Sequence, residues 1–244
     1  INKPITIIGN GITFFNTTVN INADNTNITE ITFKDNAKII INANNCNLEI
    51  DEIDITKDDS DAIITINGNN NTIRVKGEIT STATNEKSNL TVMKITGNKN
   101  NIQIENIIRS YNYNHALGFL LDNTNNTILN HSSALWLSAL NTTGAIINNS
   151  NNNTVRFNQF DSYSTEDFQG IILNNSSYNK ISGSIRAEEN PASILLKLEN
   201  NSNYNKIEEL TLRGDNLNTT PVQIIDSHYN KIYNNQINFK NLIG

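Results

Sequence analysis

The sequence predicts an all-β protein, a parallel β-helix solenoid in which about nine or ten coils of ~25 residues stack into a rod. Three observations support this fold class. A Tyr-Asn-Lys-Ile motif recurs, short β-branched runs alternate with turns, and 50 of the 244 residues are asparagine. A motif that returns every few tens of residues is typical of a solenoid, whose repeats bury their core against one another.

The repeat is clearest in the second half of the chain. Segment 176–181 reads Ser-Ser-Tyr-Asn-Lys-Ile, and similar segments follow at 202–207 and 227–232. Looser copies extend toward the N-terminus and align on one apolar column: Ile28, Leu48, Ile73, Ile102, Ile128, Val155, Ile181, Ile207 and Ile232. The apolar runs are too short for helices, and Asn, Ser and Gly bound them, so the pattern indicates strands. Strands that repeat in register stack parallel to their own copies.

An asparagine stands two residues before seven of the nine members of this column, from Ile73 onward, and predicts a structural ladder. Asparagine tolerates the left-handed backbone region, and stacked amides can hydrogen-bond to the coils above and below. The expected ladder residues are Asn71, Asn100, Asn126, Asn153, Asn179, Asn205 and Asn230. Beside it, Tyr178, Tyr204 and Tyr229 should form an aromatic column, either stacked to cover the turn or presented to a partner.

Composition limits the partners. The net charge of −6 argues against nucleic acid, which requires a basic patch. No apolar run is long enough to span a bilayer, and the single cysteine, Cys46, is expected to be a small residue in a turn. We expect residues 1–244 to form one domain of a larger surface protein, because the chain starts without methionine and the repeat continues to its end.

The order of an apolar pair, an Asn-Ser turn and Asn-x-Ile resembles the right-handed parallel β-helix repeat. This repeat occurs in pectate-lyase-like proteins (the pectin lyase fold), in periplasmic copper-assembly-type proteins and in adhesin-like surface proteins of prokaryotes. Segment 3–11, Lys-Pro-Ile-Thr-Ile-Ile-Gly-Asn-Gly, is similar to the first coil of such domains. The resemblance covers essentially the whole chain. It implies the fold but no activity, because β-helices include lyases, hydrolases, epimerases and plain binding rods.

Longer inserts are expected at one phase of the repeat, at 80–89, 109–117, 131–143, 161–169, 186–193 and 213–221. Inserts on one side of a solenoid often form its binding face. The longest contains Leu135-Trp136-Leu137 with the only tryptophan. The candidate binding residues are Trp136, Tyr111, Tyr113, His115, Tyr163 and Phe168. They either pack as a satellite core beneath the inserts or line a binding cleft.

An acidic cluster is the weaker candidate site. Asp58, Asp59 and Asp61 could bind calcium, act as a carboxylate pair on a glycosidic bond, or form a solvated loop. Polygalacturonase-type β-helices also need Asn-Thr-Asp, Gly-His-Gly and Arg-x-Lys motifs on adjoining coils, and we expect no such set in this sequence. We therefore predict no catalytic residue and no cofactor, with calcium as the alternative.

The sequence favours a non-catalytic, extracellular, adhesin-like rod at the cell surface that presents loops to a partner cell or glycan. The alternative is a carbohydrate-active enzyme, a polysaccharide lyase or glycoside hydrolase, which the fold analogy and the acidic and aromatic inserts support. A phage-type tail fibre is the second alternative. The expected partner of the protein is a cell-surface protein or a glycan.

Overall fold

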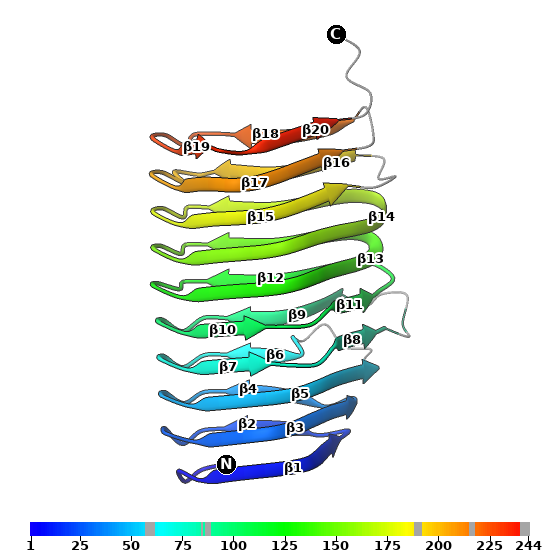
Figure 1. Ribbon diagram of the computed structural model, residues 1–244, viewed down its shortest axis with the longest axis vertical. Helices are drawn as coiled ribbons and strands as arrows, with labels where there is room; N and C mark the ends of the chain where they lie inside the picture. The colour runs from blue at the N-terminus through cyan, green and yellow to red at the C-terminus, as the bar shows by residue number, and fades with distance from the viewer. Residues whose placement is uncertain (57–61, 84, 86–88, 188–191, 215–217, 240–244) are drawn as a thin grey trace.

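The computed structural model describes residues 1–56, 62–83, 85, 89–187, 192–214 and 218–239. Within these ranges the chain forms strands and no helix, so no helix there could span a membrane. All strand pairings are parallel, and stacked residues lie 25 or 26 positions apart over much of the chain. The molecule is a parallel β-solenoid whose coils stack along the long axis from the N-terminal to the C-terminal end (Figure 1). The predicted fold class is confirmed.

Each coil contributes to three faces. The first face follows the asparagine turn and stacks strands in this order: β1(Thr6–Phe15), β3(Asn27–Asp35), β5(Asn47–Thr56), β7(Thr72–Val75), β10(Asn101–Ile104), β13(Ile128–Asn148), β14(Thr154–Asn174), β15(Lys180–Ala187), β17(Lys206–Gly214) and β19(Lys231–Tyr233). The asparagine turns form one edge of the solenoid, on the left in Figure 1.

The second and third faces complete the coil. The second face contains the later parts of β1, β3, β5, β15 and β17, the middle of β13 and β14, and β8(Ile79–Thr82), β11(Ile108–Tyr111) and β20(Gln236–Phe239). The third contains the ends of β13 and β14 with β2(Thr18–Ile21), β4(Lys38–Ile41), β6(Ile64–Ile66), β9(Asn89–Ile95), β12(His115–Asp122), β16(Ala192–Glu199) and β18(Thr219–Ile224).

Two of the expected inserts are absent. Segments 131–143 and 161–169 lie inside the 21-residue strands β13 and β14, which pass through all three faces and turn at register shifts. Segments 80–89 and 109–117 also contain strand residues, from β8, β11 and β12. The expectation of long projecting inserts was wrong at these positions because a bulge can turn a strand without a loop. Segments 186–193 and 213–221 include residues outside the described ranges.

Stacked columns of isoleucine and leucine fill the interior. The column Ile102, Leu129, Val155, Ile181 and Ile207 is paired residue by residue and fully buried. Leu129 occupies the position predicted for Ile128, whose side chain is instead 47% exposed. A shift of one residue exchanges the two sides of a strand, so this coil is one residue out of the predicted register.

The asparagine ladder is present, with one correction. The backbone N–H of Asn153 donates to Oδ1 of Asn179 at 2.9 Å, and that of Asn179 donates to Oδ1 of Asn205 at 2.8 Å. Similar bonds join Cys46 to Asn71, Asn71 to Asn100, Thr127 to Asn153 and Asn205 to Asn230. The predicted member Asn126 is exposed, and Thr127 takes its place with a longer 3.4 Å bond from Asn100 N–H.

A second ladder of serines runs beside the first. The backbone N–H groups of Ser150, Ser176 and Ser202 each donate to the serine hydroxyl of the following coil, at 3.0 to 3.1 Å. The sequence analysis did not identify this role for the Ser-Ser and Asn-Ser pairs. Together the two ladders provide hydrogen-bond partners for buried backbone groups of the turn, which would otherwise be costly to bury.

The tyrosine column stacks as one of the two predicted alternatives. The ring centroids of Tyr178 and Tyr204 lie 5.1 Å apart, and those of Tyr204 and Tyr229 lie 5.0 Å apart. All three have positive φ, between 58° and 60°, at the position that Asn70 and Asn152 occupy in other coils. Ring stacking therefore offsets part of the strain of a left-handed tyrosine backbone.

Two buried side chains titrate unusually. Cys46 lies in a turn, as predicted, but it is also buried at the asparagine-ladder position, and burial raises the pKa of its thiol. His131 faces the interior beside Phe119, with Nε2 3.0 Å from the carbonyl oxygen of Asn106. Burial lowers the pKa of His131 to about 4, and its Nδ1 has no hydrogen-bond partner. His131 is therefore a neutral core residue.

Candidate binding surface on the second face

The predicted site residues gather in part on the outer side of the second face. Arg109 of β11 pairs with Trp136 of β13, which pairs with Asp161 of β14. Two residues further along the same strands, Tyr111 pairs with Ser138 and Ser138 with Tyr163. We call Arg109, Tyr111, Trp136, Asp161 and Tyr163 the Trp136 surface. Alternation along a strand places these residues outward while Leu135 and Leu137 are buried.

Trp136 is fixed by polar contacts with both neighbouring strands. The guanidinium carbon of Arg109 lies 5.0 Å from the centre of the Trp136 ring, within range of a cation–π interaction. Arg109 also forms a 2.5 Å ion pair with Glu78. On the other side, Nε1 of Trp136 donates to Oδ2 of Asp161 at 3.1 Å. The ring is therefore held on a strand rather than on the loop that the sequence analysis predicted.

Asp161 is the most unusual polar group of this surface. Its side chain is only 4% exposed, and Oδ2 accepts hydrogen bonds from Trp136 and from Nε2 of Gln159, the latter at 2.6 Å. Its other oxygen, Oδ1, is buried without a hydrogen-bond partner among the described residues. An unsatisfied buried carboxylate oxygen is costly, so the neighbouring contacts must hold Asp161 in place.

Tyr111 and Tyr163 present aromatic side chains to solvent. Tyr111 is 46% exposed and Tyr163 is 50% exposed, and they lie two strands apart with the small Ser138 between them. Exposed tyrosines and a half-buried tryptophan offer flat apolar faces with polar edges. Such a surface, with carboxylate and guanidinium groups beside it, suits a ligand that is both ring-shaped and rich in hydroxyl groups.

The other predicted site residues lie elsewhere. Tyr113 is 49% exposed at the corner between β11 and β12, and His115 begins β12 on the third face. Nε2 of His115 lies 3.2 Å from Oγ1 of Thr143, and burial lowers the pKa of His115. Phe168 is fully buried against Phe160 in the core, so its prediction as a surface binding residue was wrong.

The described residues offer no metal centre. Within the described ranges, no group of three or more His, Cys, Asp or Glu side chains could hold a metal ion. The acidic candidates Asp58, Asp59 and Asp61 lie outside those ranges. The three histidines are separate, since His131 is in the core, His115 on the third face and His228 beside Tyr229.

One depression lies on the third face. This depression of about 420 Å³ is lined by Lys38, Ile40, Ala62, Thr65, Asn67, Thr91, Lys94 and Leu120. It has no aromatic lining residue, and Ala62 adjoins residues outside the described ranges. The Trp136 surface is therefore the better defined candidate.

The polar partners of Trp136 were missed from the sequence, although a signal was present. Arg109, Trp136, Asp161 and Arg186 follow one another at intervals of 25 to 27 residues, which is the spacing of the repeat. Alignment of the polar positions between the apolar columns would have placed them on neighbouring strands.

Comparison with family models, with curated proteins and with solved structures finds no match for this chain. The functional argument therefore depends on the geometry of the surface.

Proposed function

We propose that this protein is a non-catalytic, extracellular, adhesin-like rod that binds a glycan of a partner cell through the Trp136 surface. The observation that supports the proposal most is the grouping of Tyr111, Trp136 and Tyr163 on three neighbouring strands, beside the buried carboxylate of Asp161. Aromatic faces pack against the apolar side of a sugar ring, and fixed polar groups orient its hydroxyls. The parallel solenoid provides a rigid support for this arrangement.

The experiment is a binding screen against neutral and acidic oligosaccharides, followed by calorimetry with the best ligand. Trp136→Ala should weaken binding at least about tenfold, since a central aromatic anchor commonly contributes more than 1 kcal/mol. Tyr204→Ala is the control, because Tyr204 is an exposed aromatic residue at the turn, outside the Trp136 surface. Equal binding by wild type and the Trp136 variant would contradict the proposal.

A carbohydrate-active enzyme is the second candidate, favoured by the buried and partly unpaired carboxylate of Asp161. A turnover assay on uronate-containing and neutral glycans, with and without calcium, distinguishes the two functions. Activity that Asp161→Asn abolishes would favour the enzyme over the binding rod.

A further inference from the structure

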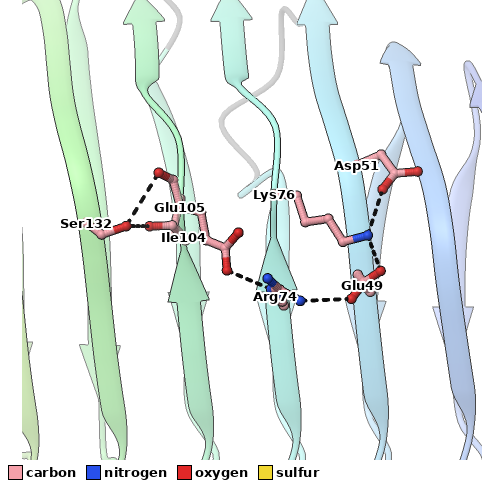
Figure 2. Close-up of polar contacts among 7 residues, drawn as sticks. All are labelled: Glu49, Asp51, Arg74, Lys76, Ile104, Glu105 and Ser132. Carbon is pink, nitrogen blue, oxygen red and sulfur yellow. Dashed lines mark hydrogen bonds and ion pairs between the residues drawn. The ribbon is translucent and has the colours of Figure 1, made fainter.

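The outer side of the first face carries a saturated charge network near its N-terminal end. Nε of Arg74 lies 2.6 Å from Oε1 of Glu105, and its NH1 lies 3.4 Å from Oε2 of Glu49 (Figure 2). Lys76 pairs with Glu49 and, at 3.6 Å, with Asp51. The hydrogen bond that Arg74 donates to Glu105 raises the pKa of Arg74, and the one that Lys76 donates to Glu49 raises the pKa of Lys76. Both cations of this network are therefore already neutralised.

The charged side chains at the C-terminal end of the same face are also ion-paired. Lys180, Lys206 and the hydroxyl of Tyr233 all donate to the carboxylate of Glu208. These contacts, with Lys180 first, lower the pKa of Glu208 to about 2. We call these four residues the Glu208 cluster.

Arg156 lies between these two paired regions, and it differs from both. It is in the same column as Arg74, but its direct neighbours are uncharged: Asn130 on β13 and Ser182 on β15. The Arg156 side chain is exposed, and its guanidinium makes no ion pair or hydrogen bond with any residue in the described part of the chain. An arginine presents several donors in a fixed plane, so this group is available for a bidentate contact.

Two adjoining depressions meet at this arginine. They measure about 220 and 210 Å³, and Arg156 and Asn158 line both. The smaller is completed by Asn130 and Ser132, and the larger includes Ser182, Ser184 and, at its edge, Glu209. Among the described residues, the side chains of Asn130, Asn158 and Ser182 make no hydrogen bonds.

The charges within the depressions indicate where an anion would bind. The smaller depression contains Arg156 with two amides and a hydroxyl, but no carboxylate. The larger contains Glu209, which would repel an anion but accept hydrogen bonds from hydroxyl groups. The chemistry thus fits a polar ligand with one oxyanion held at the smaller depression and hydroxyls at the larger.

We infer that Arg156, Asn130 and Asn158 form a subsite for a single oxyanion, a carboxylate or a sulfate ester, on the glycan that the Trp136 surface binds. This inference rests on the proposed function. Asp161 follows Arg156 by five residues on β14, a path of about 16 Å at most, and its carboxylate accepts a hydrogen bond from Trp136. Arg156 lies on the first face and the Trp136 surface on the adjoining second face, so an oligosaccharide of a few residues that follows the corner between these faces would contact both places.

The direct test uses simple anions and arginine side-chain NMR. The Nε–Hε signal of Arg156 is assigned from its loss in Arg156→Gln, and that of Arg74 likewise from Arg74→Gln. Sodium acetate or sodium sulfate is then titrated at constant ionic strength against sodium chloride. We expect the Arg156 signal to shift saturably, while the signal of the paired Arg74 stays nearly constant. Equal responses of the two arginines would overturn the subsite.

A glycan series then identifies the source of the oxyanion. The probes are oligogalacturonate, a sulfated dextran oligosaccharide and a neutral malto-oligosaccharide of similar length. Arg156→Gln should weaken binding of the matching acidic probe about tenfold or more, because it removes a charge-assisted hydrogen bond. The control Arg74→Gln removes the same charge from the same face and should leave affinity within about twofold.

The outcomes separate this inference from the proposed function. If Trp136→Ala weakens binding but Arg156→Gln does not, the Trp136 surface remains and the subsite is rejected. If Arg156→Gln weakens binding of an acidic probe but Trp136→Ala does not, the subsite remains and the proposed role of the Trp136 surface is rejected. A neutral probe that binds as tightly as both acidic probes contradicts the subsite.

Discussion

Replacement of Asn205 by alanine would remove one rung of the asparagine ladder. Oδ1 of Asn205 accepts the backbone N–H of Asn179 at 2.8 Å, and its Nδ2 donates to the carbonyl oxygen of Ser176 at 2.8 Å. Both Asn205 and Asn179 are fully buried. Asn205→Ala therefore leaves two backbone groups without these partners, and each costs about 1–3 kcal/mol. Because water can enter the space left behind, we expect a loss of about 2–4 kcal/mol.

Urea unfolding measures this loss globally, and hydrogen exchange at the Asn179 amide measures it locally. Exchange of that amide should accelerate about 30-fold or more, since 1.4 kcal/mol corresponds to a factor of ten. The control is Asn126→Gly, because Asn126 is exposed, has a φ of 55° and makes no ladder bond. Glycine adopts this φ readily, so the change should stay within about 0.5 kcal/mol. An unchanged Asn179 exchange rate in Asn205→Ala, or equal losses in both variants, would refute the ladder argument.

Four further predictions concern single side chains. Thr127→Asn should stabilise the protein by about 0.5–1.5 kcal/mol in urea unfolding, because an asparagine would replace the 3.4 Å bond to Asn100 by a shorter one; no gain would contradict this. Tyr204→Asn should be about 1 kcal/mol more stable than Tyr204→Ala, since both lose the stacked rings but only asparagine suits a φ of 58°; equal stabilities would show that strain is negligible. The pKa of His131 is lowered to about 4 in the folded state, so the unfolded state binds a proton first and the free energy of unfolding falls by about 3 kcal/mol between about pH 6.5 and about pH 4. His131→Leu should remove this decrease from the pH profile of unfolding. The pKa of Glu208 is lowered to about 2, so its contribution is present above about pH 4.5 and is lost as pH falls through about 2; Glu208→Gln should flatten the stability profile in that acid range, and an unchanged profile would contradict the cluster.

The periodic part of the fold could be predicted from the sequence because each coil repeats the same physical requirement. Ile181 and Ile207 must face the core, and Asn179 and Asn205 must satisfy the buried turn, so the same residue types return at the same spacing. Parallel stacking follows directly from such a repeat.

The prediction was less successful where two registers satisfied the same pattern. In Asn125-Asn126-Thr127-Ile128-Leu129, either Asn126 with Ile128 or Thr127 with Leu129 fits the motif. The structure selects the second because Leu129 then stacks on Ile102 in the core. The register of this strand is decided by its pairing with the preceding coil, and a motif within one coil does not contain that information.

The sequence analysis named several aromatic residues of the candidate site but not the contacts that they make. Tyr111, Trp136 and Tyr163 were grouped with three other residues because aromatic residues occur in neighbouring segments that were predicted as inserts. Phe168 was included wrongly, since the pattern gave no means of separating inward from outward positions in a segment assumed to be a loop. The role of Arg156 depends on which charges lack partners, and pairing of that kind appears only when the side chains are placed.

The ladders have a direction along the rod. The side chain of Asn179 bonds to the N–H of Asn153 and to the carbonyl oxygen of Ser150, both in the preceding coil. Ser176 does the same for Ser150 N–H and Ile147 O. Each coil therefore supplies the groups that complete the turn of the coil made before it. A ribosome releases the chain in this order, so each newly emerged coil can pair with the coil before it and supply the hydrogen-bond partners that the preceding turn lacks. The solenoid can thus assemble progressively from its N-terminal side, without waiting for distant parts of the chain.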